Sequence, residues 1–97
     1  MAKQVIWSPK AKDDLFSILE YWNNRNKSQT YGKKLNLLIK DAIEIIADHP
    51  KTGRKSDFEN VRILLVRDYH ILYEEISNTV NILRIWDNRR DETKLEL

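Results

Sequence analysis

The chain has 97 residues, a formal net charge of +2 and no cysteine. This length excludes a second domain, and we expect one domain over residues 1–97 with a single modest core. The lack of cysteine excludes disulfide bonds and thiolate metal sites, and no stretch approaches the roughly 18 apolar residues of a membrane span, so we expect a soluble protein of the cytoplasm.

A short strand and an amphipathic helix are the first predicted elements. Residues 4–7 are mostly β-branched or aromatic and stop at Ser8 and Pro9, which is typical of a strand that leads into a helix. Ser8 can cap the first amides of this helix, and Pro9 fits its first position. Asp13 and Asp14 are then expected near the positive end of the helix dipole. The apolar residues that recur every three to four positions, before the polar run 23–26 where the helix should fade, are Ala11, Leu15, Ile18, Leu19 and Trp22.

A second amphipathic helix follows a short polar loop, and the two helices should form a hairpin. The second helix is predicted to begin at Ser28 or Thr30 and to end at residues 48–50, because proline disfavours helix at the residue before it. Residues 51–60 are polar and contain Gly53, so we predict a mobile loop there. The larger apolar face of this helix consists of Tyr31, Leu35, Leu38, Ile39, Ala42, Ile45 and Ile46.

Three further strands are predicted near residues 60–67, 69–76 and 79–86. Because their links are very short, consecutive strands should pair as an antiparallel meander. The tail, residues 91–97, has no core pattern, and we expect a fraying turn there. The whole order predicts an α+β fold, in which an N-terminal strand, a two-helix hairpin and a three-stranded antiparallel meander complete one sheet.

Arginine is concentrated in the second half of the chain. Six of the seven arginines lie after residue 50, although residues 51–97 contain nine basic and nine acidic side chains and are neutral overall. A guanidinium stays charged and can hold two oxygens of a phosphate or carboxylate at once. The alternative is that several arginines only form surface salt bridges with Glu74, Glu75 and Asp87. The binding surface that we predict on the sheet and its C-terminal end consists of Arg54, Arg62, Arg67, Arg84, Trp86, Arg89 and Arg90.

Few side chains could act as an acid or a base. His49 and His70 are the only ones that titrate naturally near neutrality, and His49 lies at a helix end, where capping is the simpler role. Tyr73 could donate a proton or simply bury its ring. We expect no metal and no cofactor, because two distant histidines without cysteine make no metal site and two glycines make no phosphate loop. The candidates for metal-free RNA cleavage, which needs a base, an acid and cations at phosphorus, are Arg62, Arg67, Arg89, His70 and Tyr73.

Several short motifs, in this order along the chain, resemble the RelE/ParE superfamily of bacterial toxins from type II toxin-antitoxin systems. The resemblance covers nearly the whole chain. It implies a small toxin that inhibits growth and is neutralised by a cognate antitoxin, which would place a strand on the sheet edge and an amphipathic helix beside the hairpin. The motifs are Val5-Ile6-Trp7-Ser8-Pro9-Lys10-Ala11 leading to Asp14-Leu15, Ile18 and Tyr21; His49-Pro50-Lys51-Thr52-Gly53-Arg54; Val61-Arg62; Tyr69-His70-Ile71-Leu72-Tyr73; and Ile82-Leu83-Arg84-Ile85 with Arg89.

Members of this superfamily fall into two groups, ribosome-dependent endoribonucleases that cut messenger RNA and inhibitors of DNA gyrase. A nuclease member typically carries a tyrosine or histidine near the C-terminus, where this chain has Thr93, Lys94 and Leu95. The resemblance therefore implies inhibition of DNA gyrase by binding, without chemistry by the toxin. The alternatives are a nuclease that cuts messenger RNA at the ribosome and a decayed toxin that only binds its antitoxin.

Overall fold

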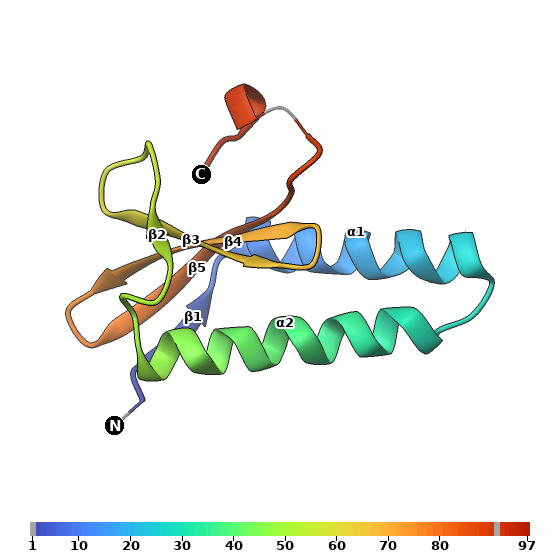
Figure 1. Cartoon of the computed structure of the whole chain (residues 1–97), viewed down its shortest axis with the longest axis horizontal. Helices are drawn as coiled ribbons and strands as arrows, with labels where there is room; N and C mark the ends of the chain where they lie inside the picture. Colours follow the sequence, from blue (N-terminus) through green and yellow to red (C-terminus); the bar gives the residue numbers. More distant parts are fainter. Residues whose placement is uncertain (1, 91) are drawn as a thin grey trace.

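Two long helices lie beside one sheet in the computed structural model, which describes residues 2–90 and 92–97 (Figure 1). The chain follows the predicted order of strand, helical hairpin and strands, so the α+β fold is confirmed. The elements are β1 (Gln4–Trp7), α1 (Pro9–Asn26), α2 (Thr30–Asp48), β2 (Arg54–Lys55), β3 (Val61–Val66), β4 (Tyr69–Ile76), β5 (Thr79–Asp87) and the 3₁₀ helix η1 (Glu92–Lys94).

The five strands form one mixed sheet in the order β1-β5-β4-β3-β2. β3, β4 and β5 make the predicted antiparallel meander, whereas β1 pairs in parallel with β5. The prediction of a mobile loop over residues 51–60 missed β2, which pairs with Arg62 and Ile63 of β3. A strand of two polar residues has no alternation from which it could be predicted.

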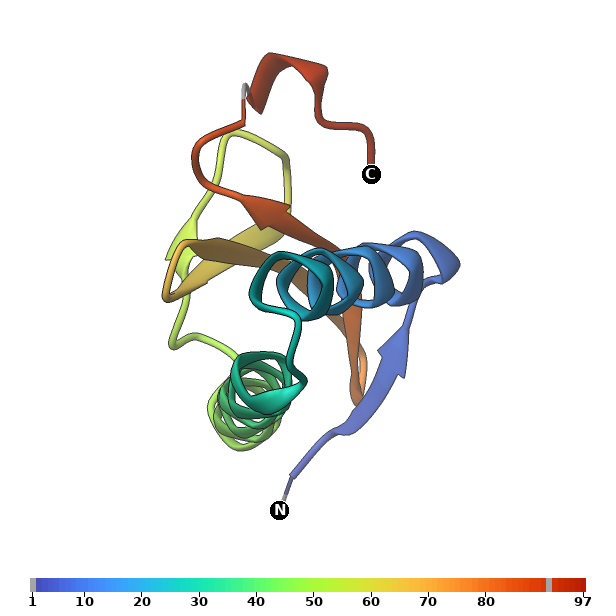
Figure 2. The ribbon, with the colours of Figure 1, turned by 90° about the vertical axis from the view of Figure 1, so that its right-hand side faces the viewer.

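Both helices cover the same face of the sheet, as Figure 2 shows in a view along their axes. The fully buried Leu35, Ile39 and Ile46 of α2 pack there against strand side chains that include Ile71 of β4 and Ile82 of β5. The apolar residues that recur at helical spacing in the sequence therefore form the face of the hairpin that contacts the sheet. Neither helix in the described part of the chain has the length and apolar composition needed to cross a lipid bilayer.

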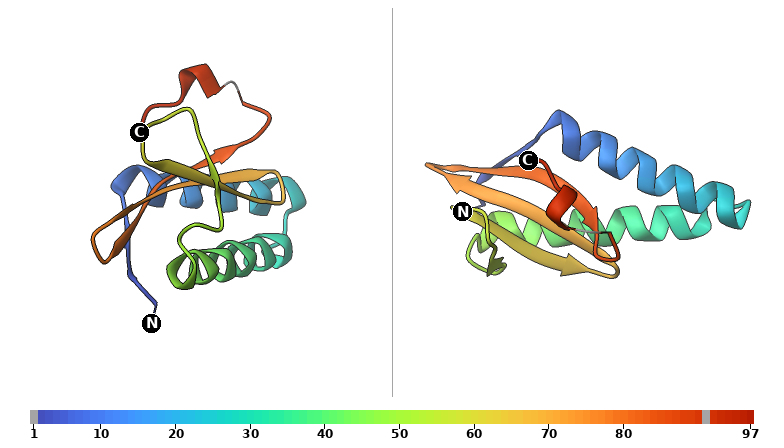
Figure 3. Two further views of the ribbon diagram at one scale, coloured as in Figure 1. Left: turned by 60° about the vertical axis from the view of Figure 1, so that its left-hand side comes forward. Right: turned by 90° about the horizontal axis from the view of Figure 1, so that it is seen from above.

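The opposite face of the sheet is covered by the C-terminal tail, which folds back over the strands (Figure 3). Leu95 is 8% exposed and packs into a second apolar cluster with Leu72 and Trp86. The expectation of a fraying tail was therefore wrong for Leu95. Two leucines at the end of a short polar segment are too few to give a periodic signal, and the burial of Leu95 depends on its tertiary contacts.

The start of α1 has the predicted cap, because the Ser8 hydroxyl accepts a hydrogen bond from the Ala11 amide at 3.0 Å and Pro9 occupies the first turn. The prediction that Asp13 and Asp14 serve the dipole at this end was wrong, since no acidic residue lies in the first turn. Asp14 instead accepts a hydrogen bond from β5.

Tyr73 of β4 joins the segment after α2 to the sheet through hydrogen bonds. Its ring is fully buried, and its hydroxyl accepts a hydrogen bond from the Gly53 amide at 2.8 Å and donates one to the Pro50 carbonyl at 2.7 Å. Burial is the main cause that raises the pKa of Tyr73. A Cβ atom on Gly53 would lie 2.6 Å from the Tyr73 hydroxyl and 2.9 Å from the Ile63 carbonyl oxygen, so this contact requires glycine.

We predict that Gly53→Ala lowers the free energy of unfolding by about 1–3 kcal/mol, because the added methyl group overpacks a site closed by backbone. Urea denaturation measures this loss. The loss should be smaller in a Tyr73→Phe background, where the nearest clashing atom is gone. An equal loss in both backgrounds would show that the hydroxyl does not set the fit.

Candidate functional site

The outer edge of β5 is covered partly by a strand and partly by side chains at the start of α1. β1 pairs with β5 only as far as Ile82. Beyond that residue, the Ser8 hydroxyl donates to the Leu83 carbonyl at 2.8 Å, and the Ile85 amide donates to Asp14 Oδ2 at 3.0 Å. Polar side chains therefore satisfy the backbone groups of the edge where the neighbouring strand stops.

A β-bulge in the same stretch changes the direction of the side chains of β5. Leu72 pairs with Arg84 whereas the next residue, Tyr73, pairs with Ile82, so Leu83 is the extra residue. A bulge of this kind re-aims the residues next to it. The side chain of Arg84 consequently lies on the same face of the sheet as Leu72. Ile82, in contrast, points to the face that the helices cover.

Arg84 and Asp14 form a nearly buried ion pair between β5 and α1. Arg84 Nε lies 2.7 Å from Asp14 Oδ2, Nη2 lies 2.9 Å from Oδ1, and each side chain is 14% exposed. The hydrogen bonds with Asp14 are the main cause that raises the pKa of Arg84. Arg84 Nη1 also donates to the Glu96 carbonyl at 2.5 Å, so one guanidinium connects α1, β5 and the tail.

A groove of about 410 Å³ lies beside this ion pair, between α1 and the end of β5. We call it the α1 groove. The buried Tyr69 contributes to its wall, and the hydroxyl of Tyr69 accepts a hydrogen bond from Trp22 Nε1 at 2.8 Å. Burial is the main cause that raises the pKa of Tyr69. The residues that line the groove are Asp14, Ser17, Ile18, Tyr21, Tyr69, Ile85, Asp87, Arg89 and Arg90.

Arg89 and Asp87 form an ion pair at the mouth of the α1 groove. Arg89 Nη2 lies 2.7 Å from Asp87 Oδ2, and Arg89 Nε donates to Asp87 Oδ1 at 2.9 Å. The hydrogen bond with Arg89 is the main cause that lowers the pKa of Asp87. The Arg89 side chain is nevertheless 58% exposed, so part of its guanidinium faces solvent and is available to a partner.

Arg90 lies over the ring of Trp86, with its guanidinium carbon 4.2 Å from the ring centroid. The guanidinium carbon of Arg84 is 5.2 Å from the same centroid. Trp86 itself is 3% exposed, so its ring is covered and makes cation–π contacts with both arginines. Within the described residues, Arg90 has no carboxylate in ion-pair contact.

The remaining predicted residues do not gather at the α1 groove. Arg62 and Tyr73 are direct partners across β3 and β4, on the helix side of the sheet, and Arg62 Nη1 donates to the Gly53 carbonyl at 2.8 Å. His70 pairs with Trp86 on the opposite face. The candidates for RNA cleavage are therefore divided between two faces of the sheet.

Arg67 and Arg54 occupy two further places. Arg67 is exposed in the turn between β3 and β4, with φ of 55°. This turn lies beside the end of β5, because the Asn88 amide donates to the Asp68 carbonyl at 2.8 Å. Arg54 lines a hollow of about 290 Å³ near Leu95, under the C-terminal tail.

Sequence reasoning missed the contribution of α1 to the groove. Asp14 lies three residues after Ala11 and four before Ile18, so a carboxylate interrupts the apolar stripe of this helix. That position was the available signal, since a charged side chain on a core-facing stripe needs a partner. No group of three or more histidine, aspartate or glutamate residues that could hold a metal ion occurs in residues 2–90 and 92–97.

Comparison with known proteins identifies relatives over nearly the whole chain. The model of a protein family described as "ParE toxin of type II toxin-antitoxin system, parDE" matches residues 5–92. Toxin RelE2 of Caulobacter vibrioides is 29% identical over 82 residues, which cover 84% of this chain and 91% of that toxin.

Two solved structures share the fold. The chromosomal ParDE system from P. aeruginosa has a TM-score of 0.79 and 20% identity, over 89% of this chain and 96% of the other. The toxin-antitoxin complex RelBE2 from Mycobacterium tuberculosis has a TM-score of 0.66 and 18% identity, over 90% and 99% of the two chains. At these identities the likeness establishes the common architecture.

We predict that Arg84→Met lowers the free energy of unfolding by about 3 kcal/mol, because it leaves the Asp14 carboxylate nearly buried without its cation. In a double-mutant cycle with Asp14→Asn, the two losses should not add, since each variant breaks the same pair. Asp13→Asn, on the exposed neighbour of Asp14, is the matched control and should change stability by less than about 0.5 kcal/mol. Additive losses in urea denaturation would contradict the pairing.

Proposed function

We propose a cellular target for this chain, which belongs to the ParE toxin family of type II toxin-antitoxin systems. The proposal is that the chain inhibits DNA gyrase by binding to it, and that no covalent bond is made or broken by the toxin. Growth would stop because the enzyme is held in an inactive complex.

The observation that carries the proposal is the separation of the candidate catalytic groups. Cleavage of RNA needs a base, an acid and cations around one phosphorus atom. Arg62 and His70 belong to opposite faces of the sheet, and the Tyr73 hydroxyl is buried and already makes two hydrogen bonds. These side chains offer no common point at which a scissile phosphate could sit.

The α1 groove, in contrast, has the character of a protein-binding site. Arg89 and Arg90 lie at its mouth, and both of its aspartates are already neutralised, Asp14 by Arg84 and Asp87 by Arg89. The groove therefore offers hydrogen-bond donors to an acidic partner. Tyr21 is half exposed at its wall and adds apolar contact area. Tyrosine and arginine are the residues that most often dominate binding energy at interfaces.

A cognate antitoxin is the second partner that we propose. Carboxylates of the antitoxin would pair with Arg89 and Arg90 and so cover the surface that the target needs. The ParDE system and the RelBE2 complex, which share this fold, are toxin-antitoxin systems, and this supports a partner of this kind. The unpaired outer edge of β1 offers a place for an added strand.

A ribosome-dependent nuclease remains the second candidate function. Arg67 and Arg89 lie at the same end of the sheet, because the Asn88 amide bonds to the Asp68 carbonyl. On this alternative, transcripts would be cut at ribosomes, and on a third, in which the toxin has decayed, growth would continue.

Expression of the chain in bacteria without its antitoxin tests the target. We predict arrested growth with DNA breaks and intact messenger RNA, measured in one culture by DNA integrity and by mapping of transcript ends. Replacement of both Arg89 and Arg90 by alanine should restore growth, because the groove loses its two exposed cations. The matched control removes two positive charges elsewhere, through Arg25→Ala and Lys33→Ala on exposed helix positions, and should stay toxic.

Cut transcripts with intact DNA would contradict gyrase as the target. Unchanged killing by the variant without Arg89 and Arg90 would move the binding surface away from the α1 groove. Circular dichroism of the purified variants must show the native spectrum, so that loss of toxicity reports on contacts and not on folding.

A further inference from the structure

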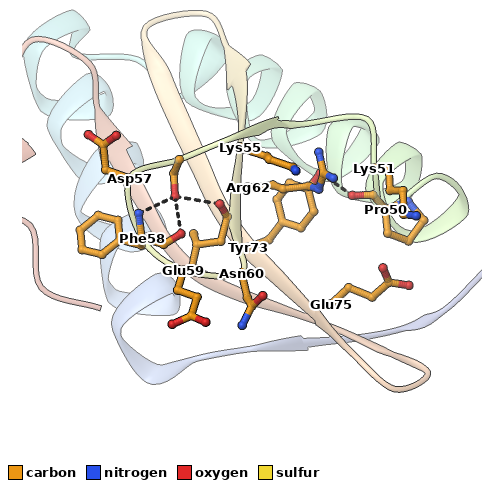
Figure 4. A pocket seen from close by; sticks show the side chains of 12 residues that line it. Pro50, Lys51, Lys55, Asp57, Phe58, Glu59, Asn60, Arg62, Tyr73 and Glu75 are labelled. Atoms are coloured by element: carbon orange, nitrogen blue, oxygen red, sulfur yellow. Dashed lines mark hydrogen bonds between the residues drawn. The ribbon is translucent and has the colours of Figure 1, made fainter.

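A second pocket, of about 440 Å³, lies far from the α1 groove in the fold, between the segment after α2 and the strands β2, β3 and β4 (Figure 4). We call it the loop pocket. Three cationic side chains line it, Lys51 from the segment after α2, Lys55 from β2 and Arg62 from β3. None of the three lines the α1 groove, so the loop pocket is distinct from the surface on which the proposed function rests.

The register of the sheet places two of these cations against each other. Lys55 and Arg62 are direct partners across β2 and β3, so their side chains leave the sheet on the same face. Like charges directly opposite in a sheet are destabilising. Within the described residues, Lys51, Lys55 and Arg62 make no ion pair with a carboxylate. The described residues therefore hold a cluster of positive charge that none of their carboxylates pairs with.

One member of the cluster, Arg62, is held in place before any ligand binds, while Lys51 and Lys55 are exposed. Arg62 is only partly exposed, and its Nη1 is held by the Gly53 carbonyl at 2.8 Å. The Tyr73 hydroxyl bonds both the Gly53 amide and the Pro50 carbonyl, which ties the backbone next to Lys51 to the sheet. A donor that is already held, as Arg62 is, loses little conformational freedom when an anion binds.

The acidic residues of the loop pocket do not cancel this charge. Glu75 is occupied by Lys3, with Nζ and Oε2 3.1 Å apart. Figure 4 shows Asp57 and Glu59 at the opposite end of the pocket from Lys51, around the ring of Phe58. The loop pocket thus has a cationic end and a separate end that combines an aromatic ring with carboxylates.

We propose that the loop pocket binds a phosphate group carried by a nucleotide, either free or as part of a nucleic-acid strand. A phosphate is compact and offers several oxygens to cations that meet at one place, whereas the carboxylates of an acidic peptide are spaced along its chain. Phe58 is 37% exposed and can stack on a base, and Asp57 and Glu59 can accept from its amino groups. The same two carboxylates repel an acidic peptide.

Nuclear magnetic resonance of the ¹⁵N-labelled full chain tests this site. Inorganic phosphate, adenosine diphosphate and a 5′-phosphorylated single-stranded oligonucleotide should each shift the amide signals of Lys51, Lys55 and Arg62. Adenosine without phosphate should leave them unchanged. Tighter binding of adenosine diphosphate identifies a free nucleotide as the source of the phosphate, and tighter binding of the oligonucleotide identifies a strand end. No shift with any phosphate probe, or tighter binding of a pentaglutamate peptide, would overturn the proposal.

Lys55→Gln and Arg54→Gln make a matched pair on one strand. Both remove one positive charge from β2, but Arg54 lines the hollow under the tail and not the loop pocket. Lys55→Gln should weaken phosphate binding about tenfold, since it removes one charge-assisted contact. It should also raise the midpoint of thermal unfolding without ligand, because the repulsion from Arg62 is relieved. Equal weakening by both variants would show diffuse attraction to surface charge and overturn the site.

Discussion

The carboxylate of Asp14 is the constraint on which the rest of the structure depends. It accepts two hydrogen bonds from Arg84 and one from the Ile85 amide, and so it joins α1 to β5 at the point where β1 no longer covers that edge. Either ion alone would be costly at 14% exposure, so each one requires the other. The link also sets the distance between the two walls of the α1 groove.

The arginines are of two kinds, those with a structural partner and those at the surface. Arg84 is paired with Asp14, and Arg62, on the other face of the sheet, donates to the Gly53 carbonyl. Arg89 and Arg90 remain at the surface, one beside Asp87 and one on the ring of Trp86. Arg89 and Arg90 are thus the arginines of the α1 groove that a partner could reach.

The features that the sequence predicts are those that repeat along the chain. The apolar stripes predicted both helices, and the Ser8-Pro9 pair predicted the start of α1. The features that it does not predict are single contacts between distant residues, such as Asp14 with Arg84, which are 70 positions apart. Strict alternation along β5 would have placed Arg84 on the helix side with Ile82, and the bulge at Leu83 reverses that. A bulge depends on the pairing of two strands and leaves no mark in either one alone.

The most direct test of the link between α1 and β5 is hydrogen exchange of the Ile85 amide. If Asp14 completes the edge of the sheet, this amide should exchange slowly in the wild-type chain. In Asp14→Ala its exchange should become fast, while the amide of Ile71 in the central strand β4 stays protected. An Ile85 amide that exchanges at the same rate in both proteins would contradict the account.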